Sequence, residues 1–198
     1  MDTKIDDTSE KIIKATLAVV QREGVEKATT KKIAAEAGFN ELTIFRKFKN
    51  KGNLIEATKD YHLKILIEKL EEIFNFDEDE EIDMFLRISF FGLINLEEDD
   101  FSILKVAMEE VRNISEDKLL ISEITDVIIN RLEEFFKLQI EKGKIKNINT
   151  KSIAVMCYGS LFQSVILWKI YGKSLSFETN NYIDDLLEIF LEGIIIQK

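Results

Sequence analysis

Cationic side chains gather in one short stretch of an otherwise acidic chain. Residues 27–51 hold seven Lys and Arg against two Glu, a local charge of +5, whereas the whole 198-residue chain carries −10. Ammonium and guanidinium groups bind phosphates, and a basic patch on an acidic protein is typical of a small nucleic-acid-reading module attached to a second domain. A solvated charged face is the alternative interpretation of the same residues.

Three lysines of this stretch occupy positions that helix electrostatics disfavour. Lys31 and Lys32 fall in the first turn of one expected helix and Lys51 in the first turn of another, where the helix dipole repels a cation by roughly 0.3–1 kcal/mol. The free amide groups of such a terminus bind phosphate, and a nearby lysine adds attraction once the anion arrives. The pattern favours phosphate binding by Lys31 and Lys51, although exposed lysines are also tolerated there because the cost is small.

The chain lacks the residues that build catalytic or metal sites of the usual kinds. One His and one Cys cannot supply a structural zinc site, and a single thiol forms no intrachain disulfide. No glycine-rich phosphate loop and no carboxylate pair at a recognisable spacing occurs. The acidic run NFDEDEE at 75–81 is simpler to interpret as a solvated loop than as a cation site. The sequence therefore predicts no enzyme, no cofactor and no metal.

Apolar residues recur every three or four positions and proline is absent, which predicts an all-α fold. Ser9 is a candidate cap of the first helix, and Gly24 is expected to end that helix in a left-handed conformation. The second helix is expected to end at Gly38. The expected helices span residues 9–23, 29–37, 41–48, 50–74, 82–96, 100–113, 116–142, 150–172 and 178–197.

The second and third of these helices are short and joined through Gly38, the layout of a helix-turn-helix. In that motif the second helix places its N-terminal residues against base edges in the major groove, and flanking cations hold phosphates. Here Asn40 through Thr43 open the reading helix.

The stretch GVEKATTKKIAAEAGFNELTIFRKFKNKGNL also resembles the N-terminal domain of the TetR (tetracycline-repressor) family of transcriptional regulators. The resemblance implies a three-helix DNA-binding domain at 1–52 and a helical effector-binding and dimerisation domain at 53–198. Phe45 stands where the family commonly has a phosphate-binding tyrosine, so this contact is lost or the ring packs on a thymine methyl or a sugar. The expected DNA-contacting residues are Thr29, Thr30, Lys31, Asn40, Glu41, Leu42, Thr43, Phe45, Arg46, Lys47 and Lys51.

The last two helices carry more apolar surface than one core can cover. The helix at 150–172 is apolar nearly all round, and the charges of the last helix form one narrow stripe. We expect both helices to pack against their copies in a second subunit as a four-helix interface, and the resemblance implies the same pair. The expected interface residues are Phe162, Val165, Ile166, Leu187, Phe190, Leu191 and Ile194.

An effector site is also implied by the resemblance, and aromatic and Met side chains in the acidic half would suit an apolar cavity. Such residues at helical spacing are equally typical of an ordinary core. The candidate ligand-binding residues are His62, Phe85, Arg87, Phe91, Met108, Arg112, Tyr158 and Gln163.

The uncharged run from Ile153 to Trp168 has 16 residues, fewer than the roughly 20 of a membrane span, and predicts a buried helix. The first ten residues lack the apolar segment of a secretory signal, so we expect a cytoplasmic protein with no membrane partner. The expected function is a homodimeric repressor that a small apolar or amphipathic effector releases from a near-palindromic DNA operator. The alternative is a ligand sensor or adaptor that keeps the fold without sequence-specific DNA reading.

Overall fold

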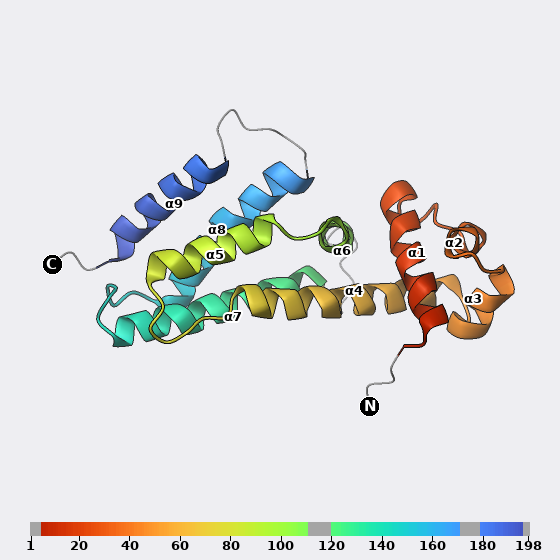
Figure 1. Ribbon diagram of the computed structural model, residues 1–198, viewed down its shortest axis with the longest axis horizontal. Coiled ribbons are helices and arrows are strands. Elements are labelled where there is room, and N and C mark those ends of the chain that lie inside the picture. The colour runs from red at the N-terminus through yellow and green to blue at the C-terminus, as the bar shows by residue number, and fades with distance from the viewer. Residues whose placement is uncertain (1–4, 111–119, 171–178, 196–198) are drawn as a thin grey trace. The chain divides into compact units, whose positions relative to one another are not determined.

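The computed structural model describes residues 5–110, 120–170 and 179–195, and these ranges are helical with short connections (Figure 1). The prediction of an all-α fold with about nine helices is confirmed within these ranges. The helices are α1 Asp7–Glu23, α2 Thr30–Ala37, α3 Glu41–Phe48, α4 Lys51–Ile73, α5 Ile82–Ile94, α6 Glu98–Glu110, α7 Leu120–Glu141, α8 Thr150–Val165, the π-helical turn η1 Ile166–Ile170 and α9 Thr179–Ile194.

The first helix begins earlier than expected, because Asp6 and not Ser9 caps it. The Asp6 carboxylate accepts from the backbone amides of Thr8 and Ser9, each at 3.2 Å. The Ser9 hydroxyl donates to the same carboxylate at 2.9 Å instead of capping. The expected cap at Ser9 is therefore wrong by three residues, since a carboxylate accepts from a helix terminus at least as well as a hydroxyl does.

The first two helices end at the expected glycines, and polar side chains cap the helices that follow. Gly24 and Gly38 adopt positive φ angles of 81° and 74°, which glycine reaches without the Cβ clash of other residues. Thr29 is the N-cap of α2, and the Asn50 side chain accepts from the amide of Asn53 at 2.8 Å at the start of α4.

The eighth helix departs from the single span expected at 150–172. It is α-helical only to Val165 and continues as η1, a wider turn that is rare in proteins. The expected ends at 111–113, 116–119, 171–172, 178 and 196–197 lie outside the described residues.

The chain folds into two compact units. Unit 1 comprises residues 1–66 and 98–106, and unit 2 comprises 67–97 and 107–198. This division differs from the expected boundary after residue 52, because the first part of α4 and most of α6 belong to unit 1. The assignment of DNA binding to residues 1–52, and of effector binding and dimerisation to residues 53–198, stays a prediction.

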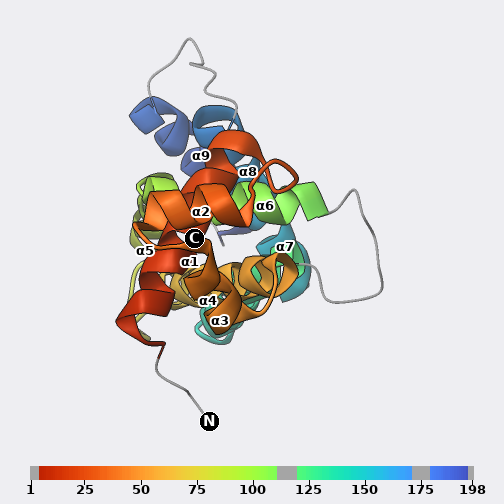
Figure 2. The ribbon, with the colours of Figure 1, turned by 90° about the vertical axis from the view of Figure 1, so that its right-hand side faces the viewer.

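Unit 1 is built on the first three helices. α1 packs on α2 and α2 on α3, and the two ribbon views place α1 beside α2 (Figure 1 and Figure 2). Ile12, Ile33 and Ile44, one from each helix, are fully buried. The hydrophobic effect thereby fixes how α3 lies on α2, so that its opposite face is left to solvent.

Unit 2 packs α7 on α8 and α5 on both α8 and α9. Aromatic rings fill its interior: Phe135 of α7 lies with its ring centroid 4.0 Å from that of Phe85 and 5.1 Å from that of Phe76. Phe136 reaches Phe190 of α9 at 6.0 Å. These contacts join segments far apart in the sequence into one apolar core.

The acidic run at 75–81 is exposed for the most part, and lysines of the α7–α8 connection contact it. The Lys142 ammonium donates to the Asp79 carboxylate at 3.1 Å, and that of Lys144 donates to Glu81 at 3.1 Å. Among the residues that the structure describes, no group of three or more His, Cys, Asp or Glu side chains could hold a metal ion.

One helical stretch in the described ranges, Thr150–Lys169, is long and apolar enough to cross a membrane by length and composition alone. A third of its most apolar window is buried in the chain. It therefore combines core positions with exposed apolar ones.

Candidate nucleic-acid interface

Asn40 holds the start of the expected reading helix. Its side-chain oxygen accepts from both the amide and the hydroxyl of Thr43, each at 2.9 Å. This contact satisfies one of the free amide groups at the helix terminus. The oxygen of Asn40 is therefore occupied, while its NH₂ group keeps its donors for another partner.

The face of α3 opposite its buried Ile44 carries large exposed side chains. Leu42 is 74% exposed and Phe45 is 43% exposed, and Arg46 is exposed as well. These residues are spaced i, i+3 and i+4, so they lie in one stripe of the helix. The stripe is the surface that α3 offers to a partner, and we name it the reading stripe.

Two other expected contacts, Thr30 and Glu41, are joined to each other. The Thr30 hydroxyl donates to the Glu41 carboxylate, which links the first turn of α2 to that of α3. The neighbouring Thr29 accepts from the amide of Lys32 at 3.3 Å as the cap of α2. These residues therefore position the motif, and their polar atoms are partly used within the chain.

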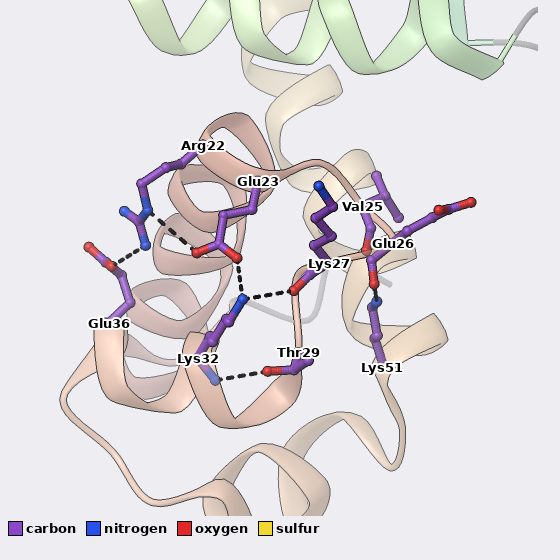
Figure 3. A network of polar contacts seen from close by, with 9 residues as sticks. All are labelled: Arg22, Glu23, Val25, Glu26, Lys27, Thr29, Lys32, Glu36 and Lys51. Carbon is purple, nitrogen blue, oxygen red and sulfur yellow. Dashed lines mark hydrogen bonds and ion pairs between the residues drawn. The ribbon is translucent and has the colours of Figure 1, made fainter.

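Lys51 and Lys32 have partners inside unit 1 (Figure 3). The Lys51 ammonium donates to the carbonyl oxygens of Val25 at 2.7 Å and Glu26 at 3.1 Å. Lys32 is paired with Glu23, whose pKa is lowered chiefly by that hydrogen bond. Both ammonium groups thus hold the turn after α1 in place.

Lys47 is also paired, with the cap of α1. Its ammonium lies 2.9 Å from the Asp6 carboxylate, and that hydrogen bond is the main reason that the pKa of Asp6 lies far below its ordinary value. A phosphate at Lys47 would compete with Asp6 for the same donor.

The exposed cations without such partners are the best placed to bind phosphate. Lys31 and Arg46 are exposed and form no ion pair or hydrogen bond with any described residue. Lys49 has the same properties and is absent from the expected contact set. Lys49 is the C-cap of α3 and has a positive φ of 69°. Its position in the basic run FRKFKNK is the sequence feature that could have identified it as a phosphate-binding candidate.

The second surface is an apolar groove of about 680 Å³ between α8 and α9 in unit 2. Its walls include Met156, which is 67% exposed, and Ile189, which is 73% exposed. Neither belongs to the expected interface set. Of that set, Phe162, Phe190 and Leu191 are partly exposed, whereas the chain's own core buries Val165, Ile166, Leu187 and Ile194.

The candidate effector residues do not form one described site. Arg87 is paired with Asp184, and the Tyr158 hydroxyl is hydrogen-bonded to that of Thr125 at 3.0 Å. Burial raises the pKa of Tyr158, so this phenol stays protonated. The other candidates divide as follows: Phe85 is buried, Phe91 is partly exposed, Gln163 is exposed, His62 is buried in unit 1, and Arg112 and the side chain of Met108 lie outside the described residues.

Gln139 of α7 was not expected as a functional residue. It is 0% exposed, and neither its Nε2 nor its Oε1 has a hydrogen-bond partner among the described residues. It lies one turn after Phe135 and Phe136 in the aromatic core. Glutamine between apolar residues is common in exposed helices, so the sequence contains no signal for this buried amide.

The chain is similar to known bacterial transcriptional regulators, both in its helix-turn-helix and over nearly its whole length. Residues 12–58 match the model of the bacterial regulatory proteins of the tetR family. Over 190 residues the chain is 26% identical to the uncharacterized HTH-type transcriptional regulator YvkB of Bacillus subtilis, covering 94% of this chain and 97% of that protein.

Two solved structures share the fold over nearly the whole chain. The putative fatty acid metabolism regulator of Clostridium perfringens has a TM-score of 0.67 at 25% identity, covering 94% of this chain and 100% of that one. The transcriptional regulator FadR of Bacillus subtilis, solved in complex with stearoyl-CoA, has a TM-score of 0.68 at 23% identity, covering 93% and 98%. Residues 12–58 thus match the DNA-binding region of the tetR family, and the helix-turn-helix together with the second helical unit supports a transcriptional regulator of that family.

Proposed function

We propose that this regulator is a homodimeric repressor that binds a near-palindromic operator in the cytoplasm and leaves it when an amphipathic effector binds unit 2. The observation that carries the dimer is the α8–α9 groove with its exposed Met156 and Ile189. Burying a large apolar side chain that is otherwise exposed to water is worth about 1.5–3 kcal/mol.

A second copy of the chain is the occupant that fits this groove. Two-fold pairing brings the same surface of each subunit together, so Met156 and Ile189 of one copy would be covered by the apolar walls of the other. Such a dimer carries two copies of α3, and its operator would have half-sites about 34 Å, one helical turn, or a multiple apart.

A long-chain fatty acyl-CoA is the first effector to test. The similarity to a regulator solved with stearoyl-CoA and to a putative fatty acid metabolism regulator supports this class. An acyl chain is apolar and its CoA group is polar, which agrees with the amphipathic effector expected from the sequence. Release from DNA requires only that the effector bind the operator-incompetent conformation more tightly.

The test begins with selection of random duplex DNA by the purified protein at near-physiological salt. We expect enrichment of an inverted repeat, bound with a Kd of roughly 10⁻⁸–10⁻¹¹ M. Stearoyl-CoA should then raise this Kd, measured by fluorescence anisotropy, while CoA alone should not. An unchanged Kd with stearoyl-CoA would reject this effector class but leave the DNA-binding function intact.

The adaptor alternative gives a different result in the same experiment. Binding would be weak on every duplex, would disappear as salt rises and would enrich no motif, because phosphate contacts alone carry no sequence information.

A further inference from the structure

We infer that α3 reads its operator through the 5-methyl groups of thymine, with Leu42 and Phe45 as the residues that determine specificity. The inference rests on the proposed DNA-reading function and names the base chemistry that this function uses.

The polar side chains at the start of α3 are largely committed within the chain. Bidentate recognition of adenine by asparagine needs both the oxygen and the NH₂ group of the amide. The oxygen of Asn40 already accepts from the amide and the hydroxyl of Thr43. Asn40 therefore retains donors only, and the hydroxyl proton of Thr43 is used in the same contact.

Glu41 is restricted in the same way. A glutamate recognises cytosine by accepting from its exocyclic amino group. In this chain the Glu41 carboxylate accepts from the hydroxyl of Thr30, and the side chain is only partly exposed. Direct polar readout by the first turn of α3 is therefore weak.

The apolar members of the reading stripe have the opposite property. Leu42 lies in the first turn of α3 with 74% of its surface exposed, and Phe45 lies one turn later with 43% exposed. The first residues of a reading helix are those that meet base edges in the major groove. Ile44 anchors the other side of α3 in the core, so this orientation is fixed by packing.

The charges around the stripe favour DNA over an apolar protein surface as its partner. Arg46 belongs to the stripe and Lys49 follows at the end of α3, and both are exposed without an ion pair among the described residues. An apolar protein partner would have to bury these cations without pairing them, and removing water from an unpaired charge costs free energy. Phosphates flank the major groove and pair with them.

Thymine is the base whose major-groove edge presents a methyl group. Covering one such carbon with Leu42 or Phe45 is worth about 0.8 kcal/mol, which corresponds to about a fourfold change in Kd. The operator half-site should therefore contain thymines at one or two positions opposite the reading stripe, and the methyl groups themselves should account for the preference.

The test uses the duplex enriched by selection. Each thymine of a half-site is replaced in turn by deoxyuridine, which removes the methyl group and leaves base pairing unchanged. Binding is measured by fluorescence anisotropy at one fixed salt concentration. We expect the Kd to rise about fourfold at one or two positions per half-site.

Protein variants then assign each methyl group to a side chain. In L42A one of the sensitive positions should tolerate deoxyuridine without further loss, and in F45A the other should, since a double-mutant cycle isolates the pairwise contact. L42M, which keeps a large apolar side chain of similar volume, should retain most of the methyl sensitivity. I88A, which truncates a side chain 51% exposed on α5, is the matched control and should bind as the original protein does.

These experiments distinguish a failure of methyl readout from a failure of sequence-specific DNA binding. An enriched motif that tolerates deoxyuridine everywhere overturns the methyl readout while the DNA-reading function stands. Methyl sensitivity that persists unchanged in both L42A and F45A overturns the assignment to these residues. If selection enriches no motif, both the inference and the proposed operator function are rejected.

Leu42 is exposed and alanine favours helix, so L42A should fold, which a thermal melt verifies.

Discussion

The ammonium group of Lys51 donates to the carbonyl oxygen of Val25 at 2.7 Å, and this contact joins the first turn of α4 to the turn between α1 and α2. A lysine at a helix N-terminus is electrostatically unfavourable, and two carbonyl oxygens of that turn offset this cost. Lys51 thus supports the position of α2, whatever it contributes to phosphate binding.

Lys51 and Lys31 should therefore differ on substitution. We expect Lys51→Ala to lower the free energy of unfolding by about 1–2 kcal/mol, since charged hydrogen bonds are lost. Lys31→Ala, which removes an exposed side chain without such contacts, should change it by less than about 0.5 kcal/mol. Urea unfolding measures both values.

The salt dependence of operator binding separates the same two residues. Loss of one phosphate contact per subunit should reduce the slope of log K against log salt by about 0.9 per contact. We expect this reduction for Lys31→Ala. An unchanged slope for Lys51→Ala would remove Lys51 from the phosphate-binding set and leave it only the structural contact.

Asn40 combines capping with an exposed NH₂ group, and two substitutions separate these roles. Asn40→Ala should destabilise the protein by about 1 kcal/mol, because α3 loses its cap. Asn40→Asp keeps an oxygen acceptor for Thr43 and should retain stability, but it places a carboxylate beside DNA and should weaken operator binding. Thermal melts measure the stability of the two variants, and fluorescence anisotropy measures their operator affinity. Equal destabilisation by both variants would contradict the capping role of the Asn40 side-chain oxygen.

A charge placed in the α8–α9 groove should dissociate the dimer. Ile189→Glu puts a carboxylate at a site that the second copy would bury, and an unpaired buried charge is costly. Sedimentation should show monomers, and operator affinity should fall because one half-site then binds alone. Ile88→Glu on the exposed face of α5 is the control, and dissociation in both variants would argue against the α8–α9 interface.

His62 should make stability depend on pH. Burial lowers its pKa, with Asp99 and Asp100 acting to raise it and Lys14 to lower it, and the net shift is downward. The unfolded chain then binds a proton at His62 more readily than the folded chain does. The share of the free energy of unfolding that depends on neutral, buried His62 is therefore present above about pH 6.5 and is lost as the pH falls below it. The loss is at most about 1.4 kcal/mol per pH unit.

Urea unfolding at several pH values between 7.5 and 5 checks this dependence. His62→Gln should flatten the curve below pH 6.5, because glutamine does not titrate. A variant with the same pH profile as the original protein would assign the loss to other groups.

The buried amide of Gln139 should cost the protein stability. Replacing it with leucine removes two polar atoms that lack partners in the described structure, so Gln139→Leu should raise the free energy of unfolding by about 1–3 kcal/mol. A decrease would show that the amide has a partner, such as a buried water molecule, in solution.

The sequence by itself determined the elements whose causes are local. The all-α fold, the turn at Gly38 and the bounds of α3 follow from apolar periodicity, caps and glycine stops within a few residues of one another. The exposure of Leu42 beside buried Ile44 is likewise a consequence of helical periodicity, because only one side of α3 can face the core.

Only the tertiary structure decided which side chains of the basic stretch are free. Lys51 meets Val25 across 26 residues and Lys47 meets Asp6 across 41, and local pattern cannot predict a pairing at such separation. The same holds for Val165 and Leu187, which the core buries, and for Met156 and Ile189, which it leaves exposed. On helices whose apolar faces are as wide as those of α8 and α9, composition does not select which apolar residues are buried; the packing of neighbouring helices does.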